Sequence, residues 1–202
     1  MVFTGGPAAG KTAILDVIQR HLDDEVAVVP ESASILFRGG FPRPKDRPGV
    51  RFVQQAIFAV QRNLEELYRH TRPDTPHVCD RGALDGAAYW PGGLEGFLGA
   101  MGTTLESEYR RYDAVIFLET AAYDVKSYPV DNPLRVESPA QARRVDTLLR
   151  RVWEKHPHFR LIKHTRDFYE KVAQCLIELH RALEMDVHTK ARWAPRQRKP
   201  SR

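Results

Sequence analysis

A glycine-rich loop near the amino terminus has the residue types and the spacing of a phosphate-binding site. It fits the pattern G-x-x-x-x-G-K-[ST] and consists of Gly5, Gly6, Pro7, Ala8, Ala9, Gly10, Lys11 and Thr12. The glycines let the backbone fold closely around an anion, so that successive N–H groups and the positive end of the following helix point at phosphates. The Lys11 ammonium can reach the β- and γ-phosphates, and the Thr12 hydroxyl can take one position on Mg²⁺. We therefore predict that the loop binds ATP, with GTP as the alternative, together with Mg²⁺.

Three acidic residues at the ends of predicted strands are candidates for phosphoryl-transfer chemistry. Glu31, Asp80 and Glu119 each end or follow a short apolar run. Because the carboxyl ends of parallel strands meet at one edge of a sheet, we expect all three beside the phosphate loop. A kinase needs one carboxylate to organise Mg²⁺ and another to accept the proton of the attacking hydroxyl. We assign Asp80 to the first role or to both, and we expect either Asp80 or Glu31 to orient the acceptor. The alternatives are helix capping by Asp80 and a solvated loop position for Glu31 and Glu119.

Four arginines could neutralise the charge that spreads over a transferring phosphoryl group. Arg81 follows the third predicted strand, and Arg135, Arg143 and Arg144 flank a polar, proline-punctuated segment from Ala121 to Glu137. A lid of this kind can bring cations to the phosphates and exclude water. We predict catalytic roles for Arg81 and Arg135, and nucleotide contacts for Arg143 and Arg144. Adjacent helix positions cannot both face one ligand well, so at least one of the last two should be solvated.

The rest of the chain alternates short apolar strands with amphipathic helices. We predict strands at residues 2–4, 26–30, 77–80, 114–118 and 160–163, and helices at 14–22, 50–70, 83–90, 138–153 and 168–183. Residues 39–49 read as an irregular basic loop. This order favours an α/β fold of the P-loop NTPase type, a three-layer sandwich around a doubly wound, mostly parallel five-stranded sheet with a lid segment.

Length and charge favour one domain with a basic appendage. We assign residues 1–189 to a P-loop kinase-like domain and residues 190–202 to a basic, disordered tail. The tail holds six basic residues and no acidic one, so the other 25 basic residues nearly balance the 26 acidic ones. This near-neutral body has no RNA or DNA motif, and we expect nucleic acid contacts only as weak ones by the tail.

The composition also bears on location and on the two cysteines. The sequence has neither a run of 18 apolar residues nor a charged-then-apolar leader, so we predict a cytoplasmic protein without membrane contact. Cys79 and Cys175 lie in apolar patterns, which predicts buried thiols rather than a disulfide or a zinc site.

Taken together, these motifs resemble the P-loop ATPase/kinase-like family that includes the nicotinamide-riboside kinase domain of NadR and the TRPL-translocation-defect proteins. The resemblance covers residues 1–185. Besides the glycine-rich loop, it rests on Val29-Pro30-Glu31, on Phe52-Val53-Gln54-Gln55 with Gln61-Arg62, on Cys79-Asp80-Arg81-Gly82, and on Arg135-Val136-Glu137 leading into Ala142-Arg143-Arg144. The Asp-Arg-Gly element is also similar to the Asp-Arg or Glu-Arg element of thymidylate and deoxynucleoside kinases, in which the acid serves the acceptor and the arginine a phosphate. The resemblance implies a shared layout, not a shared substrate.

The likeness to nucleoside and nucleotide kinases also predicts where an acceptor binds. Gln54, Gln55 and Arg62 lie on the long helix after the second strand, where such kinases place residues that touch the acceptor. We predict that these three contact the acceptor. The alternative is that they are simply exposed.

Two functions fit these residues. The leading hypothesis is an enzyme, an ATP- and Mg²⁺-dependent kinase that transfers the γ-phosphate to a small hydroxyl-bearing metabolite such as a nucleoside or a nucleotide. The alternative is a regulatory switch or slow NTPase in which the segment 121–137 responds to the γ-phosphate and signals to a protein partner. The basic tail favours the alternative. The sequence leaves open the acceptor, the choice between ATP and GTP, and the oligomeric state.

Overall fold

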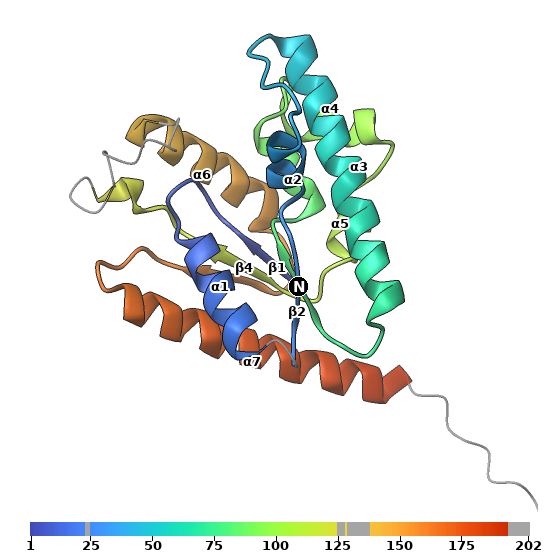
Figure 1. Ribbon diagram of the computed structural model, residues 1–202, viewed down its shortest axis with the longest axis vertical. Coiled ribbons are helices and arrows are strands. Elements are labelled where there is room, and N and C mark those ends of the chain that lie inside the picture. The colour runs from blue at the N-terminus through green and yellow to red at the C-terminus, as the bar shows by residue number, and fades with distance from the viewer. Residues whose placement is uncertain (23–24, 125–127, 129–137, 194–202) are drawn as a thin grey trace, which may run out of the picture.

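A fully parallel, five-stranded sheet forms the centre of the computed structural model, which describes residues 1–22, 25–124, 128 and 138–193, with side chains to residue 184 (Figure 1). The strand order is β2-β3-β1-β4-β5. The strands are β1 (Val2–Thr4), β2 (Ala27–Val29), β3 (His77–Asp80), β4 (Val115–Leu118) and β5 (Phe159–Ile162). Every carboxyl end therefore lies at the same edge, with β1 in the middle of the sheet between β3 and β4.

Two helices cover one face of the sheet. They are α1 (Lys11–His21) and α7 (Phe168–Trp193), which lie together below the sheet in Figure 1. Their apolar residues, among them Ile14, Ile18 and Leu179, form one core with Phe3 and Ile116 of the strands. Removing these side chains from water is the main force that holds this layer on the sheet.

The other face is covered by several shorter elements and one long helix. These are α3 (Arg47–Thr71), the 3₁₀ helix η1 (Ala83–Ala88), α4 (Gly93–Met101), α5 (Leu105–Tyr109) and α6 (Pro139–Trp153). Their core includes Leu84, Phe97 and Trp153, which pack with Val2 and Val115. Because the strands are buried on both faces, they read as continuous apolar runs rather than as an alternating pattern.

The predicted fold class is confirmed: this is an α/β sandwich of the P-loop NTPase type. Each of the five predicted strands is present, and helices were predicted correctly in the regions of α1, α3, α6 and α7. The segment 83–90 contains a 3₁₀ helix rather than an α-helix. Three short helices were missed: α4, α5 and α2 (Ser32–Arg38).

Two predicted boundaries differ from the structure. Helix α3 begins at Arg47, inside the predicted loop, because Asp46 caps it by accepting a hydrogen bond of 2.8 Å from the Gly49 amide, and Pro48 stands in its first turn. Helix α7 runs to Trp193, so the first four residues of the predicted tail are helical. Residues 194–202 and most of the predicted lid, 125–127 and 129–137, lie outside the described residues.

No helix in the described residues is both long and apolar enough to cross a membrane. This finding agrees with the absence of an apolar run in the sequence.

The two cysteines are free and buried, as predicted. Burial raises the pKa of both the Cys79 thiol and the Cys175 thiol to about 12. The reactive thiolate is therefore nearly absent at neutral pH. We expect a thiol reagent such as Ellman's reagent to leave both cysteines unmodified at pH 8 in the folded protein, and to modify both after unfolding in guanidinium chloride. Rapid modification of the folded protein would contradict this prediction.

Candidate functional site

The glycine-rich loop joins β1 to α1 and has the backbone geometry of an anion cradle. Gly5 has a φ of 139°, and a Cβ built at this residue would lie 2.0 Å from the Leu118 carbonyl oxygen. Gly10, the N-cap of α1, has a φ of 86°. Both positions demand glycine, the first for space and the second for its left-handed conformation. The loop therefore leads from a tight turn directly into the start of an 11-residue helix, whose first N–H groups and dipole favour an anion.

Lys11 folds back over this loop. Its ammonium donates hydrogen bonds to the carbonyl oxygens of Gly5 at 2.8 Å and Gly6 at 3.3 Å. Burial and the nearby Arg81 guanidinium together lower the Lys11 pKa to about 8, against the opposing effect of the acids around it. A phosphate bound in the loop would favour the charged ammonium, so Lys11 is suited to an anionic ligand.

Asp146, which the sequence analysis missed, ties α6 to the loop. One of its carboxylate oxygens, Oδ1, accepts hydrogen bonds from the amides of Gly6 at 2.9 Å and Thr120 at 3.1 Å. Burial raises the Asp146 pKa more strongly than these two amides lower it. The Thr120 hydroxyl also donates to the Pro7 carbonyl, and the Ala121 amide donates to the Ala8 carbonyl at 3.2 Å. The segment after β4 is thus bonded directly to the phosphate loop.

A second cluster of charged side chains, centred on Arg81, lies where β3 ends. Arg81 has a φ of 73°, which is rare for a residue with a side chain, and its amide donates to the Phe3 carbonyl at 3.0 Å. Its guanidinium then reaches three elements. Nε donates to Glu31 at 2.6 Å, and Nη1 donates to Asp85 at 3.1 Å and to the Gly5 carbonyl at 3.4 Å.

Asp85 is the second site residue that the sequence analysis missed. It is buried, and its carboxylate accepts hydrogen bonds from the Thr4 hydroxyl at 2.6 Å and from the Trp153 indole at 2.7 Å, besides the one from Arg81. The only sequence signal is its place four residues after Arg81, which is the spacing of an ion pair on a helix. Asp85 therefore holds the guanidinium from the side of the core.

The two predicted catalytic acids differ in their surroundings. Burial pushes the Glu31 pKa up, but Arg81 and a hydrogen bond from the Ser34 hydroxyl together lower it below the usual range. For Asp80, burial raises the pKa to about 6, with Lys11 opposing the rise and Glu31 adding to it. Within the described residues, the Asp80 carboxylate accepts no hydrogen bond and forms no ion pair. Asp80 thus keeps free oxygens close to Lys11.

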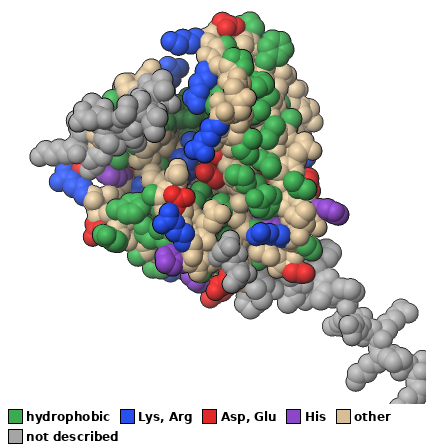
Figure 2. Space-filling model, viewed as in Figure 1, with side chains coloured by type: hydrophobic (Ala, Val, Ile, Leu, Met, Phe, Trp, Pro, Cys, Tyr) green, Lys and Arg blue, Asp and Glu red, His purple; other side chains and the backbone are tan. Residues whose placement is uncertain are grey.

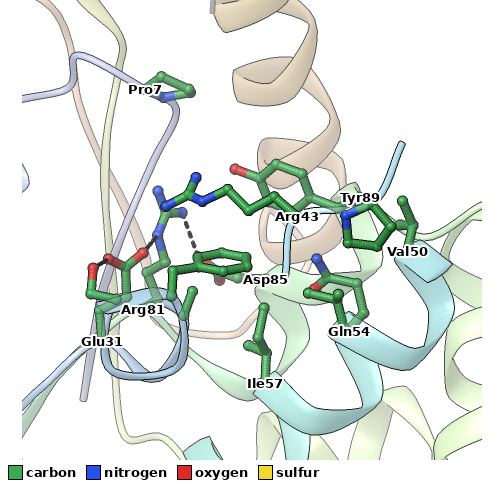
Figure 3. Close-up of a pocket in the computed structure, with 15 residues that line it drawn as sticks. Pro7, Glu31, Arg43, Val50, Gln54, Ile57, Arg81, Asp85 and Tyr89 are labelled. Atoms are coloured by element: carbon green, nitrogen blue, oxygen red, sulfur yellow. Dashed lines mark hydrogen bonds and ion pairs between the residues drawn. The ribbon is translucent and has the colours of Figure 1, made fainter. Parts of the chain in front are cut away.

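A cavity of about 520 Å³ opens beside the phosphate loop. Figure 2 shows a hollow on this face, with Lys and Arg side chains along its edge, and Figure 3 shows the side chains that line the cavity. Pro7 of the loop, Glu31 and Arg81 stand at one side, and Gln54, from α3, stands at the other. The remaining wall is mostly apolar and includes Phe37, Val50, Val53, Ile57 and Tyr89.

The three predicted acceptor residues fall in three different places. Gln54 is buried and lines the cavity. Gln55, the next residue on the helix, is exposed and is not part of the lining. Arg62 lies two turns further on and forms an ion pair of 2.6 Å with Glu108 of α5, which anchors the two helices to each other. The structure therefore brings only Gln54 to the site.

The other predicted residues are also dispersed. Thr12 is exposed in the first turn of α1. Arg143 donates to the Ala122 carbonyl at 2.8 Å, whereas Arg144 is exposed and lines a separate cavity. Glu119 accepts a hydrogen bond of 3.0 Å from the His164 amide, so it holds the loop after β5. Arg135 lies outside the described residues.

The family of the chain follows from a comparison with family models. The model described as AAA domain matches residues 1–188. The chain belongs to this AAA domain family. A search of curated proteins found no match. As an AAA domain, the protein is a nucleotide-binding P-loop protein, in agreement with the loop geometry described above.

The residues of this AAA domain fit a nucleotide with Mg²⁺. Lys11 has a lowered pKa, which a bound phosphate would reverse. Two oxygen-bearing side chains are close to it: Thr12 is the next residue of α1, and the Asp80 carboxylate acts electrostatically on Lys11. Hydroxyl and carboxylate oxygens are the protein ligands that Mg²⁺ prefers when phosphates and waters supply the rest.

The role of Asp146 can be tested by comparing two substitutions. Asp146→Ala leaves the buried Gly6 and Thr120 amides without an acceptor, and should lower the free energy of unfolding by about 1–3 kcal/mol. Asp146→Asn keeps an oxygen at the Oδ1 position, so it should lower the free energy of unfolding by less than half as much. Urea unfolding of the three proteins measures this difference. Equal losses for both substitutions would show that the two amide bonds are not what Asp146 contributes.

Proposed function

We propose that this AAA domain is an ATP- and Mg²⁺-dependent kinase for a small hydroxyl-bearing metabolite, such as a nucleoside or a nucleotide. One observation carries the proposal: a cavity large enough for such a molecule opens directly beside Pro7 of the phosphate loop and contains Glu31, Gln54 and Arg81. Hydrolysis of a nucleotide requires no second pocket of this kind. A kinase requires one, because it must hold the acceptor next to the γ-phosphate.

The loop residues bind the nucleotide in this proposal. The backbone N–H groups of the loop and the start of α1 hold the phosphates, and Lys11 leaves its two carbonyl partners to contact the β- and γ-phosphates. Thr12 and Asp80 hold Mg²⁺, which supplies neutralisation of the charge on the phosphates. The proposal takes ATP as the phosphoryl donor, with GTP as the alternative, and includes a cytoplasmic location.

Transfer of the γ-phosphoryl group requires a proton acceptor for the attacking hydroxyl and a cation near the phosphoryl oxygens. The acceptor hydroxyl oxygen forms a bond to the γ-phosphorus, the bond from that phosphorus to the β–γ bridging oxygen breaks, and ADP leaves. The hydroxyl proton passes to a carboxylate. Asp80 suits this step because neither of its oxygens accepts a hydrogen bond within the described residues, so that one oxygen can bind Mg²⁺ while the other accepts the proton. Arg81, bonded to the Gly5 carbonyl, is placed to stabilise the transferred charge.

Gln54 orients the acceptor directly, and Glu31 does so indirectly by holding Arg81 in place. Glu31 remains ionised because its pKa is lowered, and it faces the cavity with Arg81 beside it. The Gln54 amide can both donate and accept hydrogen bonds, and the apolar wall around it suits a flat ring. The proposal keeps Arg135, Arg143 and Arg144 as lid cations that complete the site when nucleotide is bound.

One observation also favours the alternative function. Thr120 and Ala121 bond the segment after β4 to Pro7 and Ala8 of the phosphate loop, so a change in the loop would pass directly to that segment. A nucleotide-dependent switch acting on a protein partner would use this connection. The same connection serves lid closure in a kinase.

The kinase proposal predicts acceptor-dependent phosphorylation. Nucleosides, nucleotides and riboside cofactor precursors are incubated with ATP or GTP and Mg²⁺, and products are identified by mass spectrometry. We expect a phosphorylated acceptor, and a loss of turnover of about 10²-fold or more in Lys11→Ala because a cation at the phosphates is removed. Release of ADP that does not depend on any acceptor would contradict the kinase and favour the switch.

The free carboxylate of Asp80 gives a second prediction. Asp80→Asn should lower kcat by about 10²-fold or more, since an amide cannot accept the proton. Asp16→Asn, which changes an exposed carboxylate on α1, is the matched control and should leave kcat unchanged. If Asp80→Asn keeps wild-type kcat, another group carries out this step.

A further inference from the structure

We propose that the acceptor carries a phosphomonoester group, and that Arg43 binds it together with the free edge of Arg81. This inference rests on the kinase proposed above and names the class of its acceptor. It follows from the hydrogen-bonding groups that the cavity leaves without partners.

The acids that line the cavity are already satisfied. Glu31 accepts from Arg81 with one oxygen and from Ser34 with the other. Asp85 accepts from Trp153 with Oδ1, and from the Thr4 hydroxyl and Arg81 with Oδ2. Neither carboxylate therefore needs a donor from the ligand.

The cations that line the cavity keep unused N–H donors, although Arg81 is paired with Glu31 and Asp85. In the described part of the chain, Arg43 has no hydrogen-bond or ion-pair partner; its guanidinium carbon stands 3.9 Å from the centre of the Phe37 ring. A ring face holds a guanidinium in place but leaves its N–H groups at the edge free to donate. Arg81 uses Nε and Nη1, while its Nη2 has no partner among the described residues. In Figure 3 the Arg43 side chain extends across the cavity toward Arg81.

The surroundings of Arg43 add positive charge. Arg43 lies in the connection between α2 and α3, which also contains Lys45 and ends at Arg47. The one acid there, Asp46, is used as the cap of α3. Basic side chains accordingly follow the edge of the hollow in Figure 2. This edge attracts an anion rather than a neutral acceptor.

A phosphomonoester fits these groups better than a carboxylate does. Two guanidiniums offer more N–H donors than the two oxygens of one carboxylate can accept in good geometry, whereas a phosphate offers three terminal oxygens and close to two negative charges. A neutral nucleoside would offer no charged acceptor to the N–H groups of Arg43 and to Nη2 of Arg81. Gln54 and the apolar wall remain available for the rest of the acceptor.

Calorimetry on matched pairs of ligands tests the proposal. The protein is saturated with the non-hydrolysable analogue AMP-PNP and Mg²⁺, so that the phosphate loop is filled, and is then titrated with adenosine, guanosine, cytidine, uridine and thymidine and with their 5′-monophosphates. We expect at least one monophosphate to bind about tenfold or more tightly than its parent nucleoside, as charge-assisted hydrogen bonds require.

Substitutions then assign the preference to Arg43. Arg43→Gln should remove the tenfold advantage of the monophosphate without changing the affinity for the nucleoside or for AMP-PNP. Arg43→Lys should retain part of the advantage of the monophosphate, because the positive charge remains but the planar guanidinium is lost. The control is Arg47→Gln, which changes an exposed arginine at the start of α3 that does not line this cavity, and it should keep the full advantage. Circular dichroism checks that each variant is folded, which we expect because Arg43 is exposed.

The outcomes separate this inference from the kinase proposal. It is overturned if no monophosphate binds, if the nucleosides bind as tightly as their monophosphates, or if Arg43→Gln weakens both members of a pair equally. When ATP replaces the analogue, transfer to neutral nucleosides alone would overturn the inference and leave the kinase standing. Arg43-dependent binding of a monophosphate with no transfer from ATP or GTP would support the inference and overturn the kinase.

Discussion

The arrangement of the site depends on the guanidinium of Arg81, which is held between Glu31 and Asp85. Removing a charge from water costs free energy unless the charge is paired and hydrogen-bonded. The Arg81 side chain is only 17% exposed, so its guanidinium requires acidic partners close to it. Those partners follow β2 and lie in η1, and a third contact reaches Gly5 of the phosphate loop. One side chain thereby fixes the relative positions of three elements that are distant in the sequence.

This pairing also decides which groups are left for chemistry. Glu31 and Asp85 use their oxygens to hold Arg81, so they act as structural acids even though they line the cavity. Asp80 is not needed for this purpose, and its carboxylate stays open beside Lys11 with a raised pKa. Among the described residues, the N–H donors of Arg43 are likewise unused. In this AAA domain, therefore, some charged side chains hold the site together, and others keep oxygens or N–H groups that can bind a ligand.

Features that depend on local sequence patterns were predicted correctly, and features that depend on contacts between distant residues were missed. The strands and long helices were visible because each buries enough apolar residues to show a period. Helices α2, α4 and α5 are five to nine residues long, too short to show one. The long helix was predicted, but not which of Gln54, Gln55 and Arg62 would reach the cavity. That depends on how α3 is rotated against η1 and α5, which contacts such as the Arg62–Glu108 ion pair settle.

By itself the sequence determined the phosphate loop, the α/β class, and the placement of Asp80 and Arg81 at a strand end, because glycine conformation, apolar periodicity and parallel strand direction act over a few residues. Only the tertiary structure decided that Asp85 and Asp146 would support the site, that Arg143 would bond to a backbone carbonyl, and that Arg43 would line the cavity. These roles depend on which side chains contact each other between elements that are distant in the sequence. A residue's type says what it can bind, but burial and partners decide what it is left free to bind.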